Sequence, residues 1–205
     1  DLNDGKALGP ATIDGDVGQL QGVATAANGD VWIADNTANH MIQFPGGDYT
    51  KGKRHTIAGL QAPFGVAVDA QNRVWVSSSY NNKLTMFPGD APDQAKTIEV
   101  NLGGRGVAVD STGHVWIAQQ SNSPQGALPP GAKMPPNIPA NAPQPKTIME
   151  EFEAGAEYLL TNPNITQTGM VGLISPDMKV VQQNIAKGTA YIPWGVSVDG
   201  NDNVW

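Results

Sequence analysis

Four side chains stand immediately before a repeated glycine and could contact a ligand. We call them the mouth residues, and they are Gln21, Phe64, Arg105 and Trp194. A second group follows the next hydrophobic segment of each repeat: Asp35, Asn36, Tyr80, Asn81, Gln119 and Gln120. Aromatic rings, amides and one guanidinium suit a polar ligand of carboxylate, sugar or peptide character. We therefore predict seven ligand-binding residues: Gln21, Phe64, Arg105, Trp194, Tyr80, Asn81 and Gln119.

Three of these assignments have a structural alternative. For Arg105 the alternative is a salt bridge within the fold. For Phe64 and Trp194 it is packing in the core, where large rings contribute most. Both roles stay open at this stage for each of the three side chains.

Residues that could do catalysis are missing or scattered. The chain has no cysteine, which excludes disulfides, thiolate metal sites and cysteine nucleophiles. His40, His55 and His114 fall at different ends of different expected strands, so they cannot converge on one zinc ion. The sequence also lacks a Gly-x-Ser-x-Gly motif and a glycine-rich phosphate loop. We predict no catalytic residue and no metal ligand in this chain.

The elements that position the mouth residues belong to a repeat of about 40 residues, the length of a propeller blade. A tryptophan marks each copy, at Trp32, Trp75, Trp116 and Trp205. Within one copy, apolar residues alternate with small or polar ones over 65–69, 73–78, 83–87 and 96–100, which predicts four short strands. The tryptophan is expected to pack between adjacent blades.

Turn and glycine positions recur with the tryptophan. A tight turn joins the first two strands of three copies and begins with Asp69, Asp110 or Asp199. An aspartate there accepts a hydrogen bond from the backbone two residues later, so we predict a structural role and not a metal site. Glycines begin the inner strands, where a side chain would clash near the central axis: Gly22, Gly65, Gly106 and Gly195.

The stretch "GVAVDAQNRVWVSSSYNNKLTMF" (65–87) resembles an NHL-type β-propeller repeat. Two copies match over nearly the full unit, a third over its first half and the last over its opening. The resemblance implies an all-β propeller of four-stranded antiparallel blades, about six when complete, of which this chain covers about three and a half. We place blades at 18–60, 61–103 and 104–190, with the start of another at 191–205.

Propellers of this type serve as lyases, lactonases, sensors and binding platforms, so the resemblance does not choose a function. The histidine metal site of the peptidyl-amidating lyase propellers does not carry over to this sequence. The gluconolactonase-like propellers hold a divalent ion with a Glu, Asn and Asp set, and no early glutamate matches that pattern here. We predict no cofactor, with a divalent ion in the central channel as the alternative.

The third copy is interrupted by residues 121–167. Its first half is proline-rich and cannot pair inside a sheet, whereas 147–160 has apolar residues at helical spacing and predicts a short helix. Loops after the second strand emerge on the same face as the mouth residues. We therefore predict a lid or partner-docking insertion, with a decorative surface insertion as the alternative.

Charge and composition limit the partners. The formal net charge of -7 argues against nucleic-acid binding. No apolar run reaches the roughly 20 residues of a membrane helix. A small polar molecule or a protein or peptide at the mouth residues is the expected partner. Abundant Asn, Gln and Ser with few Lys favour a bacterial secreted or periplasmic protein, whose signal peptide is absent from this chain.

We predict a non-enzymatic propeller that binds a ligand or protein through the mouth residues and the insertion. The alternative is a propeller lyase or hydrolase whose active residues lie partly in blades outside this sequence. A ring that stops at Trp205 would leave an open, unpaired edge. We therefore expect either a longer parent chain or self-association of two copies to complete the propeller.

Overall fold

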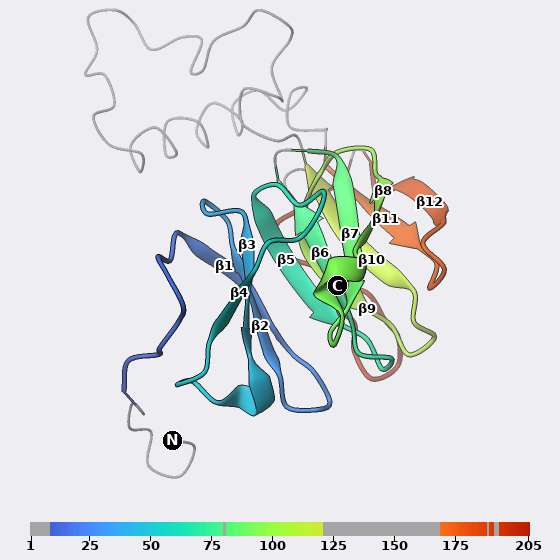
Figure 1. Ribbon diagram of the computed structural model, residues 1–205. Helices are drawn as coiled ribbons and strands as arrows, with labels where there is room; N and C mark the ends of the chain where they lie inside the picture. The colour runs from blue at the N-terminus through green and yellow to red at the C-terminus, as the bar shows by residue number, and fades with distance from the viewer. Residues whose placement is uncertain (1–8, 80, 121–168, 188, 191–192) are drawn as a thin grey trace, which may run out of the picture.

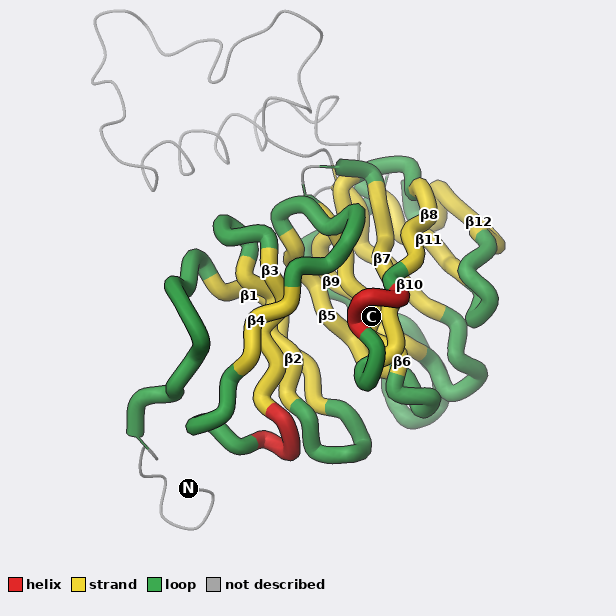
Figure 2. Tube along the Cα trace, viewed as in Figure 1, coloured by secondary structure: helices red, strands yellow, loops and turns green. Residues whose placement is uncertain are grey.

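The computed structural model describes residues 9–79, 81–120, 169–187, 189–190 and 193–205. Over these residues the chain forms three four-stranded antiparallel sheets, each built from strands that are consecutive in the sequence (Figure 1). Short turns and loops join the described strands, apart from β10 and β11, whose connection lies almost entirely outside the described residues (Figure 2). This architecture confirms the predicted all-β fold with four-stranded propeller blades.

The strands of each blade are numbered from the inner strand outward. Blade one contains β1 (Leu20–Thr25), β2 (Val31–Asp35), β3 (His40–Phe44) and β4 (Lys53–His55). Blade two contains β5 (Pro63–Val68), β6 (Arg73–Ser78), β7 (Lys83–Pro88) and β8 (Lys96–Glu99). Blade three contains β9 (Gly103–Val109), β10 (Val115–Gln120), β11 (Met170–Ile174) and β12 (Val180–Ile185). Two short 3-10 helices, η1 (Pro45–Gly47) and η2 (Pro92–Gln94), follow β3 and precede β8.

The inner strands β1, β5 and β9 lie side by side around the central channel. In blade three, β10 pairs directly with β11, with Gln119 opposite Met170, although the two strands are far apart in sequence. The predicted insertion at 121–167 and its helix lie outside the described residues.

The hydrophobic core lies between blades. Trp32 of blade one is fully buried and packs edge-on against Phe87 of blade two, with ring centres 5.2 Å apart. Trp75 of blade two is buried in the same way among residues of blade three, including Val107 and Val115. The tryptophans of blades one and two therefore pack against the following blade, which confirms the expected position for these two copies.

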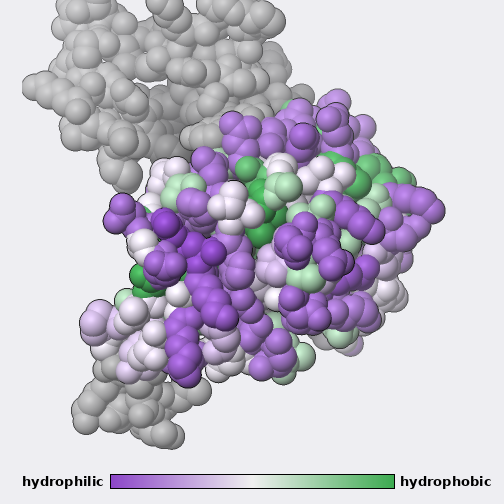
Figure 3. Space-filling view, in the orientation of Figure 1, coloured by the Kyte–Doolittle hydropathy of each residue, from purple (hydrophilic) through white to green (hydrophobic). Residues whose placement is uncertain are grey.

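Residues after Trp194 repeat the turn that joins the first two strands of a blade, since the Asp199 N–H donates to the Asn203 carbonyl oxygen at 3.0 Å. Val198 and Val204 make an isolated antiparallel bridge, and Trp205 is 77% exposed. The face shown in Figure 3 is mostly hydrophilic, with apolar residues in smaller areas. Among the described residues, none belongs to a helix that is long and apolar enough to cross a membrane.

Candidate ligand-binding site

The mouth residues come together because the inner strands pack almost backbone to backbone. A β-carbon added at Gly65 would lie 2.1 Å from the carbonyl oxygen of Arg105, and one at Gly22 would lie 2.3 Å from that of Phe64. Real β-carbons do not approach other atoms so closely, so glycine permits this spacing. The residue before each glycine is thereby held next to its counterpart on the following blade.

Three mouth residues form one cluster. The guanidinium carbon of Arg105 lies 4.7 Å from the ring centre of Phe64 and 5.3 Å from that of Trp194. The two rings are 5.5 Å apart and tilted by 58°. Both distances from the guanidinium are within the range of cation–π attraction. The cluster therefore joins blades two and three to the segment that follows blade three.

Two serines near the end of β6 in blade two hold Arg105 in place. Its Nη1 donates to the Ser79 hydroxyl at 2.6 Å, and its carbonyl oxygen accepts from the Ser77 hydroxyl at 2.6 Å. Ser77 in turn accepts from the backbone N–H of Gly65 at 2.8 Å. Because Ser77 and Ser79 are buried, these bonds hold both ends of the arginine.

A cavity of about 240 Å³ opens beside the cluster in the central channel. It is lined by residues of the three inner strands and of the segment that follows blade three: Gln21, Gly22, Val23, Phe64, Gly65, Val66, Gly106, Val107, Trp194, Gly195 and Val196. Three of the four mouth residues are therefore in the lining. Arg105 is not; its guanidinium lies against the rings.

Ala62, just before β5, helps to place Phe64. It is buried and adopts a left-handed backbone with φ of 45°, which strains any residue other than glycine. Its N–H donates to Asn39 Oδ1 at 2.7 Å, and its carbonyl oxygen accepts from the Ser79 N–H at 2.9 Å. Sequence reasoning missed this residue because alanine gives no signal of a left-handed turn.

The second predicted group is mostly engaged in structural bonds. Gln119 is fully buried; its Oε1 accepts from the Leu102 N–H at 3.0 Å and its Nε2 donates to Gln183 at 2.8 Å. Asn81 donates to the Gly59 carbonyl oxygen at 3.4 Å. Neither lines the cavity, so neither belongs to the binding site proposed below. Tyr80 lies outside the described residues.

Asp35, Asn36 and Gln120 also sit within the fold. The Asp35 carboxylate is buried and accepts from the backbone N–H groups of Gly18 and Ala38. Asn36 donates to the carbonyl oxygen of Pro63 at 3.0 Å, which ties blade one to blade two. Gln120 is 5% exposed. These side chains support the loops around the channel.

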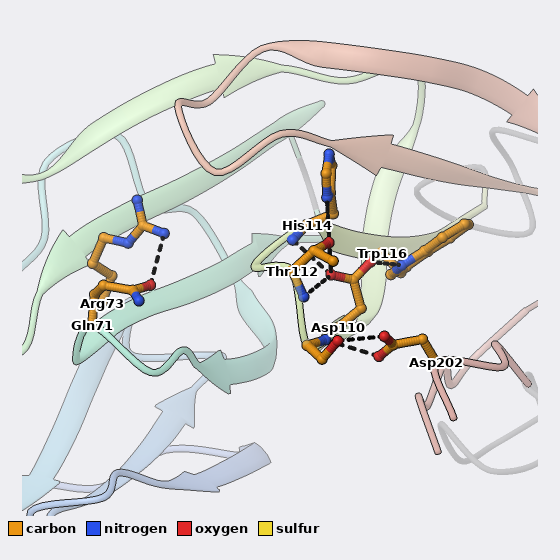
Figure 4. Close-up of polar contacts among 8 residues, drawn as sticks. Gln71, Arg73, Asp110, Thr112, His114, Trp116 and Asp202 are labelled. Atoms are coloured by element: carbon orange, nitrogen blue, oxygen red, sulfur yellow. Dashed lines mark hydrogen bonds and ion pairs between the residues drawn. The ribbon is translucent and has the colours of Figure 1, made fainter. Parts of the chain in front are cut away.

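The turn aspartates have the predicted structural role and one further contact. Asp110 accepts from the N–H groups of Thr112 at 3.0 Å and His114 at 2.9 Å, and also from the indole of Trp116 at 3.0 Å (Figure 4). Burial raises the pKa of Asp110, but the bonds from Thr112, Trp116 and His114 outweigh it and hold the pKa below its ordinary value. The aspartate thus fixes both the turn and the tryptophan.

Asp69 and Asp199 repeat this arrangement. Their carboxylates accept from the indoles of Trp75 at 2.8 Å and Trp205 at 3.3 Å. The side-chain hydrogen bond from Asn203 is the main reason that the pKa of Asp199 is lowered to about 2. The sequence predicted the turn bond, whereas the bond to the tryptophan six residues later needed the geometry of two paired strands.

The three histidines lie on different elements. His40 is on β3 and His55 on β4 of blade one, while His114 sits in the turn after β9. His55 bonds to Gln43 at 2.9 Å, and burial lowers its pKa. Within the described part of the chain, no group of three or more His, Cys, Asp or Glu side chains is arranged to hold a metal ion.

No protein-family model and no curated protein matches this sequence. Several solved structures resemble its fold. A catalytically inactive variant of virginiamycin B lyase from Staphylococcus aureus with quinupristin has a TM-score of 0.61 and 14% identity over 93% of this chain and 49% of its own. A nidogen/laminin complex gives 0.60 and 14% over 92% and 55%.

A putative gluconolactonase gives a TM-score of 0.58 and 12% identity over 93% of this chain and 56% of its own. Identities this low show a shared fold and nothing about activity. The chain spans about half the length of these solved structures. The structural neighbours include a lyase, a gluconolactonase-like protein and a protein-binding complex, and the fold alone does not decide between these functions.

Proposed function

We propose that this protein is a non-enzymatic binding propeller that holds its ligand or protein partner at the mouth of the central channel. The observation that carries the proposal is the cavity of about 240 Å³ with Phe64 and Trp194 in its lining. Partly exposed aromatic rings beside a concave site are typical of binding surfaces. Trp194 is 46% exposed, so its ring is accessible to a partner.

Two further parts of the proposal rest on sequence alone. Residues 121–167 contribute a lid or docking element on the same face, and the protein is exported to the periplasm or beyond. Self-association of two copies, which would complete the ring, is the other partner that we predict. The nidogen/laminin complex, a structural neighbour, is a precedent for protein binding by this fold.

A capture experiment tests the proposal. The immobilised wild-type chain is incubated with periplasmic and secreted bacterial proteins and small-molecule extracts, beside a Phe64→Ala/Trp194→Ala variant. Val181→Ser serves as the control, because Val181 is an exposed residue of β12 outside the cavity. A partner retained by wild type and Val181→Ser but lost from the double variant supports the proposal. Equal retention by all three contradicts it.

Turnover decides between this proposal and the enzyme alternative. The chain is incubated with quinupristin, virginiamycin B and a panel of lactones and esters, with and without divalent cations, and products are measured by mass spectrometry. We expect no turnover. Product formation that is lost on chelation would instead support a metal-dependent lyase or hydrolase.

A further inference from the structure

The cavity at the mouth has an aromatic wall whose rings meet at an angle. Phe64 and Trp194 lie 5.5 Å apart with a 58° tilt, and Trp194 is nearly half exposed. A third ring can stack on one member of such a pair while it meets the edge of the other. The wall therefore suits a flat aromatic group.

The size and polarity of the cavity agree with that shape. A cavity of roughly 150 Å³ is enough to bind benzene in an apolar protein interior. The cavity here is about 240 Å³, which leaves space for one small substituent on the ring. Gln21 is the one side-chain amide among its lining residues, and an amide can pair with an uncharged donor or acceptor.

Charge also favours a neutral ligand. The guanidinium of Arg105 lies over the Phe64 and Trp194 rings and donates to Ser79, and it is not among the cavity-lining groups. A cationic ligand would compete with it for the same rings. The net charge of -7 disfavours the approach of an anion. The cavity thus combines an aromatic wall with a lining of uncharged side chains.

We propose that the cavity binds an uncharged aromatic group that carries a small amide or hydroxyl substituent. Arg105 is then a positioning residue that fixes the two rings, and not a direct partner of a ligand carboxylate. This inference rests on the proposed binding function and narrows its ligand class. It narrows the polar ligand of carboxylate, sugar or peptide character that the sequence predicted to an uncharged one.

Benzamide and benzoate form a matched pair of probes, because they have the same ring and nearly the same size but differ in charge. The full chain is labelled with 5-fluorotryptophan and titrated with each probe while the fluorine resonances of its five tryptophans are followed. Trp194→Phe assigns the Trp194 resonance. The other four resonances report whether each variant keeps its fold.

We expect benzamide to shift the Trp194 resonance and to bind at least threefold more tightly than benzoate. Phe64→Ala should weaken benzamide at least fivefold, because it removes half of the aromatic wall. Arg105→Met should weaken both probes by a similar factor and leave their ratio unchanged, and Arg105→Lys, which keeps the charge over the rings, should recover part of the loss. The Val181→Ser variant should bind both probes as wild type does.

Tighter binding of benzoate, with a preference that disappears in Arg105→Met, would overturn the inference and make this an anion site. A missing response to both probes would overturn it as well. The proposed function fails separately, when the capture experiment shows equal retention by the wild type and the Phe64→Ala/Trp194→Ala variant.

Discussion

Blades one and two build the same turn but treat their tryptophans differently. In both, the N–H of the first turn residue donates to the carbonyl oxygen four residues later: Ala26 to Asp30 at 2.8 Å and Asp69 to Arg73 at 3.0 Å. Trp32 and Trp75, each six residues after the first residue of its turn, are both fully buried. In blade two the Trp75 indole donates to Asp69. Blade one has alanine at that position.

The consequence is a buried donor without an acceptor. Among the described residues, none accepts a hydrogen bond from the indole nitrogen of Trp32. Asn28 supplies the missing acceptor for the backbone of this turn, since its Oδ1 accepts from the N–H of Asp30 at 3.0 Å. The comparison indicates that the turn backbone can use another acceptor, whereas the tryptophan indole is hydrogen-bonded only in the blade whose turn begins with an aspartate. Four experiments can break or sharpen that distinction.

The largest effect is expected from Asp69→Ala. The substitution removes the acceptor for the N–H groups of Gln71 and Arg73, for the Arg73 guanidinium and for the Trp75 indole. Leaving one buried and three part-buried donors unpaired should lower the free energy of unfolding by about 3 kcal/mol. Urea denaturation measures the change, and Asp69→Asn should cost less because it keeps one acceptor. A loss below about 1 kcal/mol would contradict the role assigned to this carboxylate.

Introducing an aspartate at the equivalent position of blade one should raise the free energy of unfolding instead of lowering it. Ala26→Asp supplies an acceptor for the buried Trp32 indole and should raise the free energy of unfolding by about 1 kcal/mol. The gain is smaller than the loss at Asp69, because Asp30 stands where blade two has Arg73 and repels a second carboxylate. The same substitution in a Trp32→Phe background is the control. An equal gain in both backgrounds would show that the indole is not involved.

A paired truncation isolates the indole bond. Trp75→Phe and Trp32→Phe remove similar ring area from equivalent buried positions, but only Trp75 loses a hydrogen bond to a carboxylate. We expect Trp75→Phe to destabilise the protein by about 1 kcal/mol more than Trp32→Phe. Thermal or urea unfolding of both variants measures the difference. Equal costs would mean that the bond contributes little once the ring is packed.

The smallest effect is a shift in acid stability. Since folding holds the pKa of Asp110 below its ordinary value of 3.8, the stability from this group is fully present above that value. It is lost as the pH falls through the lower pKa of the folded state. Stability measured from about pH 6 to about pH 2 should therefore decline less steeply in Asp110→Asn than in wild type. A steeper decline in the variant would refute this assignment.

The sequence alone determined the blade, its strands and the reasons for several fixed positions. Alternation of apolar residues follows from the two-residue period of a strand, and a repeat of about 40 residues gave the four-stranded unit. The aspartate turns could be predicted because an aspartate bonds to the backbone two residues away, which is a local interaction. The glycines that begin the inner strands could be predicted because a side chain there would clash near the central axis.

The contacts of the mouth residues, in contrast, could be known only from the tertiary structure. Phe64, Arg105 and Trp194 are far apart in the chain, and their contact requires three inner strands packed side by side. The sequence could count an arginine among possible ligand contacts, but only the packing placed it against two rings and Ser79 and outside the cavity lining. Gln119 likewise had the right type and position, yet its bonds to Leu102 and Gln183 keep it inside blade three. Side-chain direction comes from neighbouring blades, and a single repeat does not encode it.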